Sequence, residues 1–179
     1  PETSIPSGQM VPNDFYSDAL TISPYMGRDS IQPFVDVAEQ NGGGVFVLVK
    51  TSNPGGKDIQ NLVADGDFVY TYVAKMISEL IPSVGHSGYG PIGVVVGATV
   101  ADDVAALREW LPQSIFLMPG LGAQGGSLDT VKAAYDEKGS GVVVPVSRGI
   151  TRVADAHVSL SDYRILVSDQ ARHFVGLLQ

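Results

Sequence analysis

The chain has 179 residues, of which 44% are hydrophobic and 17% charged, as is usual for one globular domain. Its net charge of −8 and pI of about 4.6 argue against a nucleic-acid-binding surface or an anchor on an anionic membrane. The lack of cysteine excludes a disulfide framework and a thiolate metal site, and no apolar run approaches the roughly 20 residues of a membrane helix. We therefore expect residues 1–179 to form one cytoplasmic domain.

Short apolar runs dominate the chain after an N-terminal stretch, residues 1–16, whose Pro, Ser, Gly and Asn content predicts irregular structure. Each run is rich in Val, Ile, Leu or Phe and is apolar on both faces, which is typical of buried parallel strands. The predicted strands are residues 19–23, 45–50, 92–97, 115–118 and 142–146.

Stretches with helical spacing separate these runs. The first is expected to be capped by Asp29 or Ser30, with Pro33 in its first turn. Further helices are predicted over residues 68–80, 104–111 and 128–135, and a last one over the barrel from about Ser161. Repeated alternation of strand and helix indicates an α/β fold with a parallel sheet. Five strands are too few for a closed eight-stranded barrel, which typically takes about 250 residues.

A glycine-rich segment, Pro119-Gly-Leu-Gly-Ala-Gln-Gly-Gly126, joins a predicted strand to a helix. Clustered glycines let backbone amides approach a phosphate, and the following helix N-terminus favours an anion. Residues 120–125 also match the dinucleotide pattern G-x-G-x-x-G, a weak signal alone. The alternatives to a phosphate-binding loop are a nucleotide-binding Rossmann fold and a glycine-rich turn without a ligand.

Arg148 follows the next apolar strand directly, where an unpaired guanidinium is costly unless it meets an anion or solvent. In barrels the last two strand–helix loops frequently build a phosphate site together. The same residue lies at a distance from the glycines that would suit the 2'-phosphate of NADP in a Rossmann fold. The Rossmann fingerprint normally opens the first strand–helix–strand unit, however, and three strands precede this one, so we favour the barrel.

Lys50 and Ser52 end the second predicted strand in the segment Val47-Leu-Val-Lys-Thr-Ser-Asn-Pro-Gly-Gly56. Two residues apart on a strand, both can point toward a ligand face. A lysine in such a place suits proton transfer or Schiff-base chemistry when its pKa is lowered, but is more often an ion-paired or solvated rim residue. Ser52 is the better candidate ligand contact because the Ser-Asn-Pro-Gly turn fixes it. No histidine has metal-site spacing, so no metal is expected.

Four segments, in this order, resemble the orotidine 5'-monophosphate decarboxylase family, in its "TSNPG" branch. They are Asp18-Ala-Leu-Thr-Ile-Ser-Pro-Tyr-Met-Gly27, Val47–Gly55, Met118–Gly126 and Val146-Ser-Arg-Gly-Ile150. The resemblance covers residues 17–152 and implies the C-terminal two-thirds of a homodimeric (β/α)8 TIM barrel with its N-terminal strands absent from this sequence. It further implies conversion of orotidine 5'-monophosphate to UMP and CO2 without metal or organic cofactor.

The resemblance also assigns roles to individual residues. It implies that Ser52 contacts the orotate ring, that Pro119 lines the pyrimidine pocket, and that Gln124 and Arg148 hold the 5'-phosphate. The backbone amides near Ser147 and Gly149 assist at the phosphate. The family's proton donor is a lysine in an Asp-x-Lys-x-x-Asp strand motif, and none of the lysines here lies in one: Lys50, Lys57, Lys75, Lys132 and Lys138.

The resemblance thus implies the binding half of a decarboxylase site without its catalytic half, and no activity for this chain alone. Two alternatives stay open at this stage. One is a non-catalytic nucleotide-phosphate-binding fragment. The other is a different phosphate-binding barrel, such as a sugar-phosphate lyase or isomerase.

Overall fold

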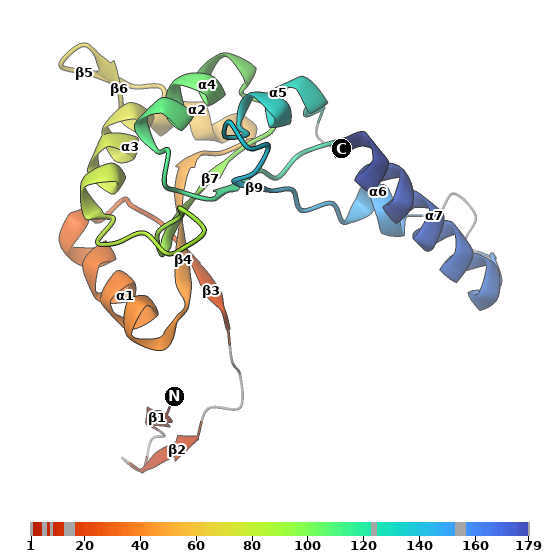
Figure 1. Ribbon diagram of the computed structural model, residues 1–179, viewed down its shortest axis with the longest axis horizontal. Helices are drawn as coiled ribbons and strands as arrows, with labels where there is room; N and C mark the ends of the chain where they lie inside the picture. Colours follow the sequence, from red (N-terminus) through yellow and green to blue (C-terminus); the bar gives the residue numbers. More distant parts are fainter. Residues whose placement is uncertain are drawn as a thin grey trace.

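The computed structural model describes residues 2–4, 7, 9–12, 17–122, 125–152 and 157–178. Its centre is a five-stranded sheet in the order β3-β4-β7-β8-β9, and every neighbouring pair is parallel. This confirms the predicted set of parallel neighbours (Figure 1). The strands are β3 (Ala19–Ile22), β4 (Gly44–Lys50), β7 (Ile92–Val96), β8 (Phe116–Leu117) and β9 (Val142–Val143).

The predicted helices are also present, at slightly different bounds. The first begins at Arg28, so neither Asp29 nor Ser30 caps it, and Pro33 lies beyond its first turn. Gly27 precedes it with a φ of 93°, a conformation that glycine adopts without strain. The helices are α1 (Arg28–Asn41), α3 (Val69–Leu80), α4 (Ala101–Trp110), α5 (Leu128–Ala133) and α7 (Leu160–Leu178).

Several short elements were not expected. A 3₁₀ turn, η1 (Pro54–Gly56), and a helix, α2 (Lys57–Gln60), follow β4, and a hairpin of β5 (Val63–Ala64) and β6 (Asp67–Phe68) comes next. Another short helix, α6 (Arg148–Thr151), follows β9. Residues 1–16 were expected to be irregular, but β1 (Glu2–Ser4) pairs with β2 (Met10–Pro12) as an antiparallel ladder. Backbone pairing of this kind needs no apolar pattern, so the sequence gives no signal for it.

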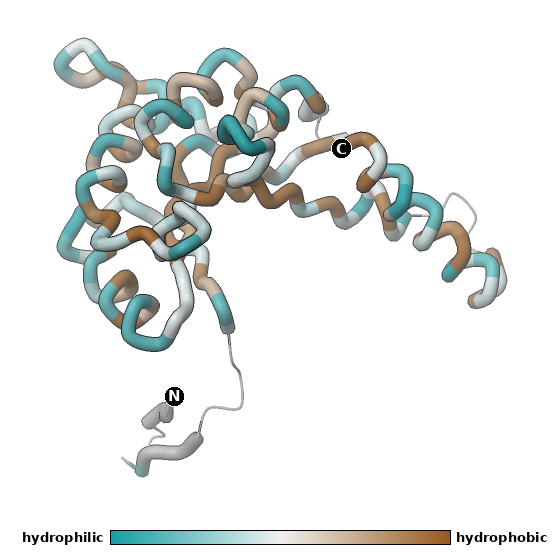
Figure 2. The backbone as a smooth tube through the Cα atoms, in the orientation of Figure 1, coloured by the Kyte–Doolittle hydropathy of each residue, from teal (hydrophilic) through white to brown (hydrophobic). Residues whose placement is uncertain are grey.

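The hydrophobic core lies between the sheet and the helices that cover one of its faces. Val45, Val47 and Val49 alternate along β4 toward this core, and β7 is buried along its whole length. In Figure 2 hydrophobic residues run through the central strands, and hydrophobic and hydrophilic residues alternate along the helices. None of the described helices combines the length and apolar character needed to cross a bilayer.

The sheet of the described residues has an edge at β3. Among the described strands, β3 pairs with β4 alone. A groove of about 670 Å³ runs between β3 and α1, and Leu20, Phe34 and Val37 line it with exposed apolar surface.

Arg108 of α4 ties together the loops that lead into β8 and β9. Its guanidinium donates hydrogen bonds to the carbonyl oxygens of Ala134 (2.7 Å), Leu111 (3.0 Å), Ser114 (2.8 Å) and Gly141 (2.9 Å). One half-buried cation therefore satisfies four carbonyl groups at the N-terminal ends of these strands.

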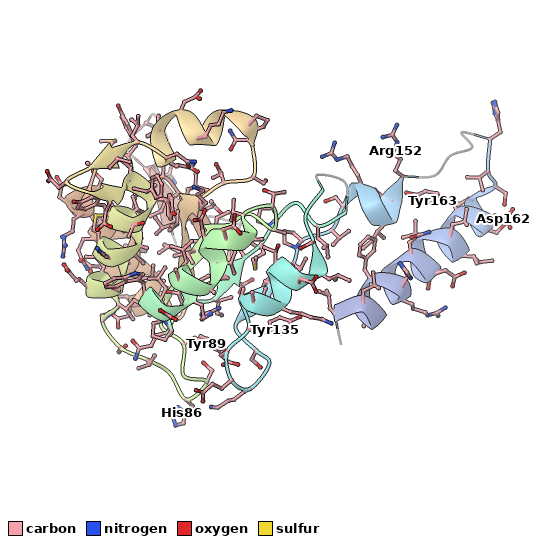
Figure 3. The ribbon with its side chains drawn as sticks, turned by 90° about the horizontal axis from the view of Figure 1, so that it is seen from above. His86, Tyr89, Tyr135, Arg152, Asp162 and Tyr163 are labelled. Atoms are coloured by element: carbon pink, nitrogen blue, oxygen red, sulfur yellow. The ribbon has the colours of Figure 1, made fainter. Side chains whose placement is uncertain are left out.

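Helix α7 extends away from the sheet and is held near both of its ends (Figures 1 and 3). Tyr163 donates a hydrogen bond to the carbonyl of Thr151 in α6, and Tyr135 donates one to the carbonyl of Leu178, each at 3.1 Å. The last helix was predicted to lie over the barrel. It instead lies beside α5 and α6, at the end of the sheet formed by β9.

Candidate functional site

The loops after β4, β7 and β8 form one continuous edge at the C-terminal ends of the strands. Ser52 packs against Gly97, where an added Cβ would lie 2.8 Å from the Ser52 Cβ and 2.9 Å from its backbone nitrogen. The next residue, Ala98, donates its amide hydrogen to the carbonyl of Pro119 at 2.9 Å. Two predicted site residues from separate strands, Ser52 and Pro119, are thus joined through only two intervening residues.

A small pocket of about 190 Å³ lies between the loops that follow β8 and β9. Arg148 and Gly149 are the first two residues of α6, where helix amide groups have no carbonyl partner within the helix, whereas the amides of Ile150 and Thr151 donate to the Ser147 carbonyl at 3.0 and 2.9 Å. Among the described residues, none forms a hydrogen bond or ion pair with the Arg148 side chain. Backbone donors and a guanidinium at one pocket are suited to an anion the size of a phosphate. The lining residues are Pro119, Gly120, Leu121, Pro145, Val146, Ser147, Arg148 and Gly149.

The glycine-rich loop closes on itself beside this pocket. Gly126 donates its amide hydrogen to the carbonyl of Gly120 at 3.0 Å, and a Cβ at Gly126 would meet that oxygen at 2.7 Å. Glycine is therefore required at position 126 by close backbone approach. Ser127 then caps α5, its hydroxyl accepting from the Thr130 amide at 3.1 Å. Gln124, a predicted phosphate ligand, lies outside the described residues.

Lys50 does not share the orientation expected from strand parity. The pairing of β4 with β7 shifts register between Leu48 and Lys50, as happens at a β-bulge, and a bulge re-aims the side chains that follow it. The Lys50 side chain accordingly lies among residues of α3 and α4, with only 6% of its surface exposed. It is an ion-paired lysine, the more ordinary of the two roles considered above.

The structure thus brings Pro119, Ser147, Arg148 and Gly149 together in one pocket and links Ser52 to it through the β7 loop. Sequence patterns missed Phe174 of α7. A Cβ at Gly149 would meet its ring at 3.0 Å, and one at Gly122 would meet it at 3.6 Å.

Phe174 therefore packs against both pocket loops. Across the described parts of the chain, no group of three or more His, Asp or Glu side chains is placed to hold a metal ion.

Comparisons with known proteins agree with these motifs. The family model described as "Orotidine 5'-phosphate decarboxylase / HUMPS family" matches residues 9–163. An orotidine 5'-phosphate decarboxylase of Rhodopirellula baltica is 55% identical over 135 residues, which is 75% of this chain and 45% of that protein. Its counterpart in Clostridium tetani is 48% identical over 139 residues, 76% of this chain and 48% of that protein. The chain thus spans about half the length of these relatives.

Solved structures show the same relationship at the level of fold. The OMP decarboxylase of Leishmania donovani superposes with a TM-score of 0.67 at 35% identity, covering 90% of this chain and 58% of that one. The UMP synthase of the same organism gives 0.63 at 38% identity, covering 87% and 33%. The five-stranded sheet is therefore part of a (β/α)8 barrel, and the chain belongs to the orotidine 5'-phosphate decarboxylase / HUMPS family.

Proposed function

We propose that this chain is the pyrimidine- and phosphate-binding part of an orotidine 5'-monophosphate decarboxylase. The complete enzyme converts orotidine 5'-monophosphate to UMP and CO2 in pyrimidine biosynthesis, as a cytoplasmic homodimer without metal or organic cofactor. The observation that carries this proposal is the pocket between the β8 and β9 loops, where Arg148 and first-turn amides meet Pro119 in a chain of this family.

Each binding residue has a role that its position supports. Arg148 forms charge-assisted hydrogen bonds to the 5'-phosphate, together with Gln124 and the amides near Ser147 and Gly149. Pro119 lines the pyrimidine pocket, and its contact with Ala98 places it next to the loop that holds Ser52. Ser52 then contacts the orotate ring, at the far end of the nucleotide from its phosphate.

The proton that replaces the lost carboxylate comes from outside this sequence. Decarboxylation leaves a carbanion-like centre that needs a positioned acid and electrostatic stabilisation. Lys50 is committed to a buried ion pair with Asp103, and no lysine in the sequence lies in an Asp-x-Lys-x-x-Asp motif. We call this chain, joined to a segment that carries that motif, the complete barrel.

Ligand preference in the complete barrel tests this function. We expect UMP to bind more tightly than uridine and than ribose 5-phosphate, because only UMP fills both halves of the site. Calorimetric titration with the three ligands gives the order. Tighter binding of ribose 5-phosphate than of UMP would reject the decarboxylase in favour of a sugar-phosphate lyase or isomerase.

A further inference from the structure

We propose that Lys50 is a positioning residue for Ser52, acting by fastening the two ends of the loop that carries this serine. The inference rests on the proposed function, in which Ser52 contacts the pyrimidine ring. The loop leaves β4 at Lys50, passes through η1 and α2, and ends at Asn61. Its two ends are joined directly, since the Lys50 ammonium donates to the Asn61 Oδ1 at 2.5 Å.

The ammonium is itself fixed by the neighbouring helices. Lys50 Nζ lies 3.4 Å from Asp103 Oδ2 of α4 and 3.8 Å from the centroid of the Tyr70 ring of α3. Tyr70 completes the arrangement by donating to Asp103 Oδ1 at 2.7 Å, and burial together with this hydrogen bond raises its pKa to about 12. A carboxylate, an amide oxygen and an aromatic face together compensate the desolvation of the lysine. The loop is therefore anchored to two helices of the barrel wall.

A second pair of residues, Thr51 and Gln60, also joins the two ends of the loop. The Thr51 amide donates to Gln60 Oε1 at 2.9 Å, and Gln60 Nε2 donates to Thr51 Oγ1 at 2.8 Å. Ser52 comes directly after these paired residues and packs against the bare backbone of Gly97. Lys50 and Thr51, at the end of β4, are thus hydrogen-bonded to Asn61 and Gln60, at the end of α2. The position of Ser52 follows from this double closure.

A double-mutant cycle for UMP binding in the complete barrel tests the proposal. We expect Ser52→Ala to weaken UMP binding about five- to tenfold, as the loss of one ligand hydrogen bond does. Lys50→Met should produce a similar loss when Ser52 is present and less than about a twofold loss in the Ser52→Ala background. Binding of inorganic phosphate should change in neither variant, because the β8 and β9 loops hold it.

Lys75→Met is the matched control. Lys75 is also paired with a carboxylate, Asp67 at 2.6 Å, and lies 4.8 Å from the Trp110 ring centroid, and both of these partners lie outside the loop from Lys50 to Asn61. We expect it to leave UMP affinity unchanged. If Lys50→Met does not fold, Asn61→Ala takes its place in the cycle, since it removes the Lys50–Asn61 hydrogen bond and leaves the Lys50–Asp103 pair in place.

An equal loss in both serine backgrounds, or no loss when Ser52 is present, would overturn the positioning role. A complete barrel that binds UMP no better than inorganic phosphate would instead refute the proposed function, and this inference with it. The titration of the wild-type barrel therefore shows by itself whether the proposed function has failed or only the positioning role of Lys50.

Discussion

The guanidinium of Arg108 stacks over the ring of Phe116, with its Cζ 3.8 Å from the ring centroid. Phe116 is fully buried and opens β8, so the cation covers the core at the end of the sheet opposite the pocket between the β8 and β9 loops. Burial lowers the pKa of Arg108, while the neighbouring Tyr89 and Asp136 oppose that shift. The Arg108 side chain thus covers the core and also binds the loops that lead into β8 and β9.

Arg108→Ala should therefore destabilise the complete barrel by about 2–4 kcal/mol, because it uncovers Phe116 and removes the donor from four carbonyl groups. Urea denaturation provides the measurement. Arg172→Ala is the control: its partner Asp169 and Arg172 itself are both well exposed, so a change within about 0.5 kcal/mol is expected. Similar effects for the two substitutions would show that Arg108 is an ordinary surface residue.

The hydrogen bond from Tyr89 to Asp136, 2.5 Å long, makes stability depend on pH. This bond, with the amide of Ser140, holds the pKa of Asp136 below its ordinary value of 3.8. Its contribution is therefore present above pH 3.8 and is lost as the pH falls through the lower folded-state pKa. Burial, with Asp136, raises the pKa of Tyr89 above 10.0, so the contribution of the tyrosine is present below pH 10.0 and lost as the pH rises further.

Tyr89→Phe should consequently lower the melting temperature at neutral pH and converge with the wild type in acid. Thermal melts of both proteins between about pH 2 and 8 supply the comparison. A gap in melting temperature that stays constant down to the lowest pH would remove Asp136 from this explanation.

Arg148→Ala should weaken UMP binding to the complete barrel roughly 30-fold or more, as expected when about 2–5 kcal/mol is lost with one member of a charge-assisted pair. The net charge of −8 means that long-range attraction does not hold the phosphate, so short contacts must. Uridine, which has no phosphate, should lose far less. Equal losses for the two ligands would make Arg148 a structural residue.

The 179-residue chain, expressed by itself, should have no decarboxylase activity because the Asp-x-Lys-x-x-Asp motif is absent from it. Conversion of orotidine 5'-monophosphate is followed by absorbance, with the mass of 18.8 kDa verified on the same sample. Turnover by a chain of that mass would mean that another residue donates the proton. A heavier protein from the same source would point to an enzyme that supplies the motif.

Gly97→Ala should weaken UMP binding by displacing Ser52, since its Cβ would meet Ser52 at 2.8 Å. Overpacking of this kind costs about 1–3 kcal/mol. Gly176→Ala, in α7 with nothing within 4 Å, is the control and should not reduce UMP affinity. Unchanged UMP binding by Gly97→Ala would indicate that Ser52 does not reach the ligand.

The strands and helices were predictable because they depend on local patterns of apolar residues. The β7 run is apolar throughout and the β4 run is apolar up to Val49, and their flanking residues mark the loops of the site. The direction of Lys50 was not predictable, since a register shift against β7 sets it, and such a shift depends on pairing with a distant strand.

The same distinction applies to the candidate site. Pro119, Ser147, Arg148 and Gly149 were identified from motifs and meet in one pocket. The contacts that hold the site join residues far apart in sequence, such as Lys50 with Asp103 and Gly149 with Phe174. A single sequence carries no spacing signal for them.

The edge of β3, unpaired among the described strands, has a practical consequence when residues 1–179 are produced by themselves. Its outer row of main-chain amides and carbonyls can pair with any strand that offers a free edge, including one from another copy. The apolar groove beside it, formed with Phe34 and Val37, strengthens such association. Self-association of this chain will then compete with folding as the protein concentration rises, so light scattering should increase with concentration.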